Sequence, residues 1–123
     1  MAFINYNPNP IGRNVGDCSV RAISKALSLD WELAYILQIL KGLEMCDMPS
    51  SDAVWGSVLR DNGFNKYLLP DICPECYTVI DFCNDYKDGT YVLALGGHVL
   101  TVKDGDYYDS WDSGNEVPLY YWR

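Results

Sequence analysis

The spacing of hydrophobic residues is helical in the first part of the chain and strand-like in the last part. Before residue 90, apolar side chains recur every three or four positions, which places them on one face of a helix. This spacing predicts helices at residues 18–29, 31–43 and 51–62 and a short helical turn at 78–84. The apolar face of the second helix consists of Leu33, Ile36, Leu37 and Leu40.

The residues around these segments are typical of helix ends. Asp17 and Asp30 precede the first two helices as N-caps, and Thr78 with Asp81 has the spacing of a capping box. Gly63 can end the third helix in a left-handed conformation. With Asp17 as the N-cap, Cys18 lies in the first turn of the first helix.

From residue 90 onwards, short apolar or alternating segments separated by turn residues predict strands. They cover residues 90–95, 98–103, 106–112 and 117–122. Asp104-Gly105, between two alternating segments, is a strong signal for a two-residue hairpin.

This order of elements predicts an α+β fold with N-terminal helices packed on a C-terminal antiparallel sheet. It lacks the βαβ alternation and the glycine-rich loop of a nucleotide-binding fold. Residues 5–14 contain two prolines, one glycine and four asparagines, which predicts an irregular arm. No repeat or low-complexity segment divides the chain, so we expect a single domain over residues 1–123.

Composition narrows the function classes. With 49% hydrophobic residues the chain is expected to fold, and 17 acidic against 9 basic residues give it a net charge of −8. Such a charge disfavours binding to nucleic acid or to an anionic membrane. No apolar run approaches the roughly 20 residues of a membrane span, and the first residues lack the pattern of a signal peptide. We therefore expect a cytoplasmic protein.

His98 is the only histidine, which excludes a zinc hydrolase of the HExxH type. Pairing outward from the hairpin places Asp109 diagonal to His98, with Leu100 and Trp111 on the same face of the sheet. Asp109 can then fix the imidazole tautomer, and the Trp111 indole can shield their hydrogen bond from water. Asp112 is a rival acid, but this register puts it on the opposite face. On position alone, a hydrogen-bonded structural histidine at the start of a strand is the commoner case.

Among the five cysteines, Cys18 is the best candidate for a nucleophile. A thiol at a helix N-terminus lies at the positive end of the helix dipole, and an adjacent imidazolium stabilises the thiolate further. The alternative for Cys18 is a small buried core residue. The charge of Asp17 would oppose the thiolate unless that carboxylate is turned into its capping role.

At these residues the sequence resembles the papain-like cysteine peptidases, in particular small bacterial or phage-type members. The family order is a cysteine on the first helix, a histidine at the start of a later strand and an asparagine or aspartate on the next strand. Cys18, His98 and Asp109 follow this order, and Asp109-Ser110-Trp111 is similar to the Asn-Ser-Trp of the family.

Further short motifs carry the same resemblance. Gly97-His98-Val99 is similar to the histidine strand of the family, and Asp17-Cys18 is similar to the bacteriocin-leader peptidases. The resemblance implies a Cys18–His98–Asp109 triad that hydrolyses a peptide or isopeptide bond of a peptide or protein substrate, without a cofactor.

The oxyanion hole departs from the family pattern. The family commonly places a glutamine six residues before the nucleophile, where this chain has Gly12. Asn14, with the Cys18 backbone N–H, is the best substitute as an oxyanion donor, and Asn9 is a second possibility.

Cys73-Pro74-Glu75-Cys76 is the next chemical signal. Cys73 and Cys76 could bind zinc together with Cys46 and Cys83, or cycle as a redox pair, but we favour ordinary turn cysteines. An odd number of cysteines without an export signal makes a disulfide framework unexpected and leaves at least one free thiol.

Two functions of another class remain open. A catalytically silent papain-like module would bind a protein partner through its aromatic sheet edge, with Cys18 buried or His98 bonded elsewhere. A zinc-stabilised adaptor would hold metal on Cys73 and Cys76. Substrate specificity and oligomeric state have no signature in the sequence.

Overall fold

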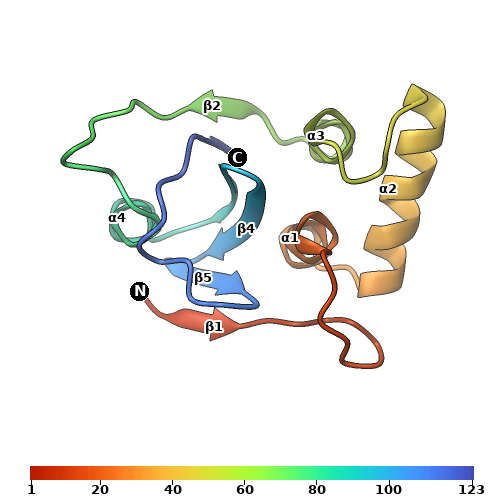
Figure 1. Cartoon of the computed structure of the whole chain (residues 1–123), viewed down its shortest axis with the longest axis horizontal. Helices are drawn as coiled ribbons and strands as arrows, with labels where there is room; N and C mark the ends of the chain where they lie inside the picture. Colours follow the sequence, from red (N-terminus) through yellow and green to blue (C-terminus); the bar gives the residue numbers. More distant parts are fainter.

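The computed structural model describes residues 1–123 and contains four helices and a six-stranded mixed sheet (Figure 1). The helices are α1 (Cys18–Leu27), α2 (Trp31–Met45), α3 (Asp52–Asp61) and α4 (Val79–Asp85). The strands are β1 (Phe3–Asn5), β2 (Lys66–Leu68), β3 (Thr90–Leu95), β4 (His98–Lys103), β5 (Asp106–Asp109) and β6 (Tyr120–Trp122). The α+β class and all four predicted helices are therefore confirmed. None of the helices combines the length and the apolar character that a membrane crossing requires.

The sheet has the strand order β1-β5-β4-β3-β6-β2. The hairpin between β4 and β5 has the predicted register, with Lys103 opposite Asp106 and Thr101 opposite Tyr108. Asp104 and Gly105 both have positive φ, of 50° and 81°, as a two-residue hairpin turn requires.

The prediction of a purely antiparallel sheet was wrong, because β1 pairs in parallel with β5. Neither β1 nor β2 was predicted, since three residues are too few to show a periodic pattern. Two predicted strands are also shorter than expected: β5 ends at Asp109 and β6 begins at Tyr120. Pro118 cannot donate a ladder hydrogen bond, which accounts for the late start of β6.

The caps of three helices follow the sequence pattern. The Asp30 side chain accepts a hydrogen bond from the Leu33 backbone N–H, and Thr78 and Asp81 form the predicted capping box. Gly63, just after α3, has φ of +90°. The fourth cap, Asp17, behaves differently and belongs to the site described below.

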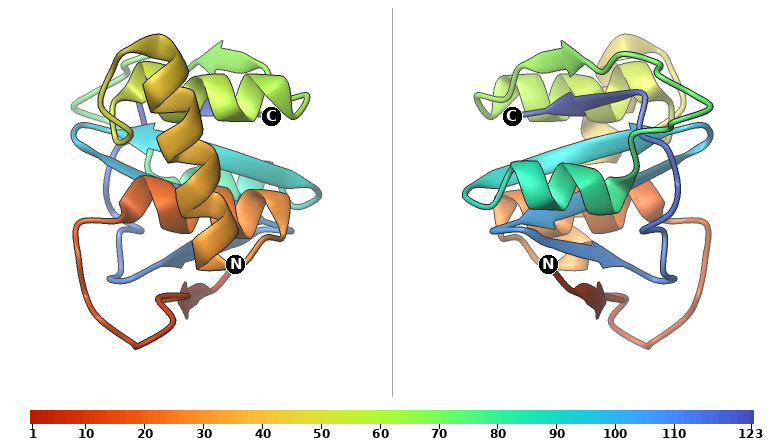
Figure 2. Two further views of the ribbon diagram at one scale, coloured as in Figure 1. Left: turned by 90° about the vertical axis from the view of Figure 1, so that its right-hand side faces the viewer. Right: turned by 90° about the vertical axis from the view of Figure 1, so that its left-hand side faces the viewer.

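Two apolar cores lie on opposite faces of the sheet. Helices α1 and α3 cover one face and α4 covers the other, while α2 lies outside α1 (Figures 1 and 2). Successive residues of β4 alternate between the cores, with Val99 in the first and Leu100 in the second. The largest members of the first core are Trp55, Trp122 and Leu59, and those of the second are Phe82, Tyr91 and Tyr107.

Helix α2 packs through small and polar residues. Its buried residues are Ala34, Gln38 and Gly42, spaced four apart along one side. A Cβ atom on Gly42 would come within 2.9 Å of the Asp47 carbonyl oxygen, so only glycine allows the following loop to approach this closely. The apolar face of α2 points away from the core.

Candidate active site

His98 and Asp109 meet at the ends of neighbouring strands. The Nε2 atom of His98 lies 2.7 Å from Oδ2 of Asp109, whose side chain is 1% exposed. Three more donors hold this carboxylate: the Ser113 hydroxyl at 2.7 Å, the Ser110 backbone N–H at 2.8 Å and the Arg21 guanidinium at 3.3 Å. Asp109 is therefore fixed in one orientation by several hydrogen-bond donors, as an acid that orients an imidazole must be.

The prediction that Leu100 shares one face of the sheet with His98 and Asp109 was wrong. Leu100 packs into the core beside α4, whereas His98 and Asp109 turn towards Arg21 on α1. The ladder between β4 and β5 ends at the Thr101–Tyr108 pair, and Gly97 with φ of +74° directly precedes His98. His98 and Asp109 therefore lie beyond the regular pairing of these two strands, and their side chains do not follow the strict alternation between the two faces of the sheet.

The Trp111 indole lies beside the imidazole, as expected. The ring centroids of His98 and Trp111 are 5.1 Å apart, with a 40° angle between the planes. Trp111 is 44% exposed, so its ring shields one side of the imidazole and faces solvent with the other.

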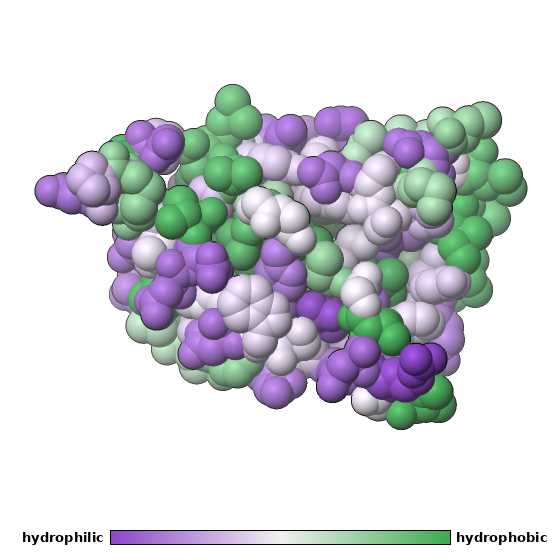
Figure 3. Space-filling model, in the orientation of Figure 1, coloured by the Kyte–Doolittle hydropathy of each residue, from purple (hydrophilic) through white to green (hydrophobic).

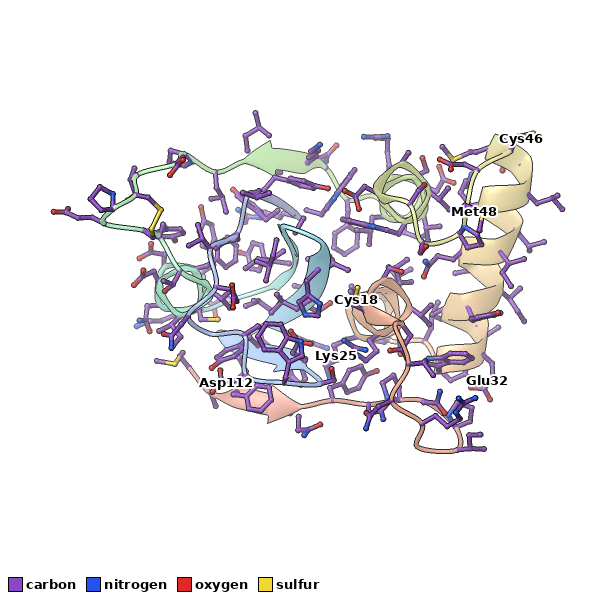
Figure 4. All side chains as sticks on the ribbon, viewed as in Figure 1. Cys18, Lys25, Glu32, Cys46, Met48 and Asp112 are labelled. Atoms are coloured by element: carbon purple, nitrogen blue, oxygen red, sulfur yellow. A yellow bond between two sulfur atoms is a disulfide. The ribbon has the colours of Figure 1, made fainter.

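Cys18 is the first residue of α1 and its half-buried side chain faces the sheet (Figure 4). Burial raises the pKa of the Cys18 thiol, but hydrogen bonds with His98 and with the Val99 backbone N–H, together with the charges of His98 and Arg21, lower it below its usual value. Because Nε2 of His98 faces Asp109, Nδ1 is the ring nitrogen available to the thiol.

The pKa of the His98 imidazole shifts in the opposite direction to that of the thiol. Burial lowers the pKa of His98, but hydrogen bonds with Asp109 and Cys18 and their charges raise it to about 9. A thiol pKa that falls and an imidazole pKa that rises both favour a thiolate–imidazolium pair.

Asp17 does not cap α1, so this prediction was wrong. Its side chain makes no capping hydrogen bond. Instead, the carboxylate forms a buried ion pair with Arg21, one helical turn on, and accepts a 2.8 Å hydrogen bond from Nε1 of Trp31. Arg21 also contacts Asp109, so that one guanidinium pairs with two buried carboxylates.

The missing cap leaves donors beside the thiol. The backbone N–H groups of Cys18 and Ser19 have no intrahelical acceptor, because they belong to the first turn, and no side chain caps them. These N–H groups point out of the N-terminus of α1, where the helix dipole favours negative charge. They can bind an oxyanion that forms at the thiol.

Neither predicted asparagine lines the cleft around Cys18. Asn14 is exposed, and its Oδ1 accepts a 3.3 Å hydrogen bond from Asn7. Oδ1 of Asn9 accepts from the backbone N–H groups of Ile11 and Arg13. These side chains fold the arm before α1, the usual role of asparagine in turns, and the side-chain oxyanion donor expected from Asn14 is absent from the cleft.

Two hollows adjoin the thiol. A cleft of about 160 Å³, here called the thiol cleft, is lined by Cys18 and His98, with Trp55 and Val99 among the other walls. A larger cavity of about 630 Å³ lies between α1, α2 and the arm at residues 9–16, and is called the arm cavity below. Gly16, Ser19 and Ser50 line both.

The remaining cysteines and the rival acid lie elsewhere. Cys73 and Cys76 form a disulfide, which corrects the expectation of ordinary turn cysteines and removes both thiols as zinc ligands. No group of three potential metal ligands occurs in the structure. Cys46 is exposed and Cys83 is buried, which raises the pKa of Cys83 to about 11. Asp112 accepts a hydrogen bond from the Tyr107 hydroxyl, away from the imidazole.

Sequence reasoning missed two residues of the site. Arg21 follows Asp17 at the i,i+4 spacing of a helical ion pair, and this spacing could have identified it. Ser113 lies in the loop after β5 and reaches Asp109 only through the path of that loop, for which the sequence has no signal.

Comparison of the chain with protein-family models, with curated proteins and with solved structures found no match. An assignment of function therefore depends on the geometry of the site.

Proposed function

We propose that this protein is a papain-like cysteine peptidase that hydrolyses a peptide or isopeptide bond with Cys18 as the nucleophile. The observation that carries the proposal is that Cys18 and His98 line one cleft while Nε2 of His98 is hydrogen-bonded to the buried Asp109 carboxylate. The placement of the thiol at a helix N-terminus and of the imidazole at the start of a strand adds support.

The acylation step uses the groups described above. His98 takes the proton of the Cys18 thiol, and the thiolate attacks the carbonyl carbon of the scissile bond. The backbone N–H groups of Cys18 and Ser19 stabilise the oxyanion. When the C–N bond breaks, His98 donates its proton to the leaving amine, and the acyl group remains on Cys18 as a thioester.

Deacylation reverses the roles. Water enters the thiol cleft, His98 removes a proton from it, and the resulting hydroxide attacks the thioester carbonyl. The C–S bond breaks, the carboxylic acid product leaves, and the thiolate–imidazolium pair is restored. Asp109 remains ionised throughout and stabilises the imidazolium.

The alternative is a catalytically silent module of the same fold. Such a module would bury the thiol or hold the imidazole away from it. Here Cys18 lines an open cleft and His98 keeps one ring nitrogen for it, which favours the peptidase.

The test is covalent trapping followed by a search for cleavage. The wild type is incubated with an epoxysuccinyl peptide inhibitor, and the modified cysteine is identified by mass spectrometry. We expect modification of Cys18 in preference to the exposed Cys46, and no adduct in Cys18→Ala. A peptide mixture from denatured proteins then shows new termini with the wild type but not with Cys18→Ala. Equal labelling of Cys18 and Cys46 with no cleavage would contradict the proposal.

A further inference from the structure

The arm cavity adjoins the thiol cleft. Both hollows share Gly16, Ser19 and Ser50, whereas Cys18 and His98 line only the thiol cleft. Its volume of about 630 Å³ is within the usual range of ligand pockets. A substrate bound with its carbonyl carbon at the Cys18 thiol can therefore extend a side chain into the arm cavity.

The position of His98 decides which side of the substrate enters the cavity. His98 protonates the leaving amine, so the amine side of the scissile bond must lie next to the imidazole. The arm cavity begins at the residues flanking Cys18 and extends towards α2, away from the imidazole. The acyl side of the substrate is therefore the one that faces the cavity.

The wall of the cavity on α2 is aromatic and aliphatic, and polar residues of α1 and of the arm complete the lining. The rings of Trp31 and Tyr35 stack with centroids 4.9 Å apart, and Ile39 continues this surface along α2. Asp17, the acidic residue of the lining, is ion-paired with Arg21. Arg13, on the arm, is therefore the one charged side chain of the lining without an ion-pair partner, and it repels a basic substrate side chain.

We propose that the arm cavity binds a large apolar side chain, aromatic or branched aliphatic, on the acyl side of the scissile bond. This inference rests on the proposed peptidase function. If the inference holds, Trp31, Tyr35 and Ile39 determine the specificity for this substrate side chain.

The test uses dipeptidyl vinyl sulfones, which alkylate a catalytic thiol after binding through their acyl-side residues. Phe, Leu, Ala or Lys occupies either of the two positions, with Gly in the other. We expect the Phe or Leu probe to modify Cys18 about tenfold faster than the Ala or Lys probe at one position. Ile39→Asp should remove this preference, while Leu68→Asp, a control on the exposed strand β2, should retain it.

Iodoacetamide carries no amino-acid side chain, so its reaction with Cys18 tests the peptidase function separately from the role of the arm cavity. If iodoacetamide and all probes modify Cys18 no faster than Cys46, the peptidase function itself fails. If Cys18 is selectively reactive but the probes show no preference, or Ile39→Asp leaves the preference intact, the function stands and the role of the arm cavity is wrong. Circular dichroism confirms that each variant is folded.

A second, independent observation concerns the outer face of α2. Four large aliphatic residues lie on the side of the helix opposite the buried Ala34, Gln38 and Gly42. They are Leu33, Ile36, Leu40 and Leu43, and they are 49%, 49%, 57% and 75% exposed. Apolar residues gather along the right-hand edge of the molecule, where α2 lies (Figures 1 and 3). We call these four residues the α2 seam.

The spacing of the α2 seam fits a second copy of itself. Steps of three, four and three residues are those of the a and d positions of a coiled coil. In an antiparallel pair centred near Gln38, Leu33 of one copy faces Leu43 of the other, and Ile36 faces Leu40. The seam carries no charge. Glu32 and Glu44 lie on opposite flanks of the helix, so this arrangement does not bring them face to face.

The area available suits a weak dimer. A 15-residue helix is about 22 Å long and, with its side chains, about 10 Å wide, so two seams in contact bury on the order of 1,000 Å². This area lies at the lower limit of specific interfaces. Each copy carries a net charge of −8, whose repulsion weakens association further at low salt.

We infer that the α2 seam forms a weak antiparallel homodimer with two-fold symmetry. Sedimentation velocity across the micromolar range at physiological salt should show a reversible monomer–dimer equilibrium. Leu40→Glu should leave only monomer, whereas Leu68→Glu, which changes a more exposed leucine on β2, should dimerise like the wild type. A wild type that stays monomeric throughout, or a Leu40→Glu variant that still dimerises, would overturn the inference.

Discussion

Asp17 and Asp109, 92 positions apart in the sequence, share the guanidinium of Arg21 beneath the candidate active site. One of these carboxylates precedes Cys18 and the other holds His98 at 2.7 Å. The arrangement keeps the negative charge of Asp17 paired, so that it does not oppose a thiolate at the next residue. The same buried cation also fixes the acid that orients the imidazole.

The first prediction concerns this orienting acid. Asp109→Asn keeps the shape of the side chain but removes the charge that stabilises the imidazolium. We expect kcat/KM for peptide hydrolysis to fall by a factor on the order of 10³–10⁴. The pH above which Cys18 is alkylated should also rise. Unchanged kinetics in a folded Asp109→Asn variant would show that Asp109 has no part in the reaction.

The second prediction concerns stability. Arg21→Met fills a similar volume but leaves two buried carboxylates without their cation. Breaking a buried ion-pair network in this way should lower the free energy of unfolding by about 3 kcal/mol. Urea denaturation measures the loss, and Arg13→Met, on the exposed arm, should change it by less than about 0.5 kcal/mol.

The third prediction tests the raised pKa of His98 in a Cys18→Ser background, where the thiol does not titrate. In this background the hydrogen bond and charge of Asp109 still raise the pKa of His98 above 6.5, so the charged imidazole stabilises the fold fully below pH 6.5, and this contribution is lost as the pH rises through the folded-state pKa. The difference in unfolding free energy between Cys18→Ser and Cys18→Ser/His98→Gln should therefore shrink over this range. A difference that stays constant or grows would mean that the pKa of His98 is not raised.

The fourth prediction separates the two sources of oxyanion donors. If the backbone N–H groups of α1 bind the oxyanion, Asn14→Ala should change kcat/KM by less than about threefold. Loss of a true side-chain donor typically costs about 100-fold or more. A loss of that size in Asn14→Ala, with the arm still folded, would show that Asn14 moves into the cleft when substrate binds.

Local patterns predicted most of the fold. Asp104-Gly105 identified the hairpin and its register, and Asp30 identified the start of α2, because turn and cap preferences act over a few residues. The parallel strand β1 could not be predicted in this way, since its three residues are ordered by pairing with Tyr107–Asp109 at the other end of the chain.

In the candidate site, too, local patterns predicted some features, and contacts between distant residues decided the others. Strand pairing placed Asp109 near His98, although the face assigned to Leu100 was wrong. The cap assigned to Asp17 failed because Arg21 and Trp31 compete for its carboxylate, and the Trp31 contact spans a turn between two helices. The pairing of Cys73 with Cys76 depends on the loop conformation, which the motif does not specify.

The most direct test of the central claim is the pH dependence of Cys18 alkylation. Iodoacetamide modification of Cys18 is followed by mass spectrometry, with Cys46 in the same sample as an exposed reference thiol. We predict that the Cys18 rate reaches half its maximum below the ordinary thiol pKa of 9.0. In His98→Gln this midpoint should move upwards, because burial then acts on the thiol without the imidazolium. A midpoint equal to that of Cys46, unchanged in His98→Gln, would contradict the thiolate–imidazolium pair and the peptidase function that depends on it.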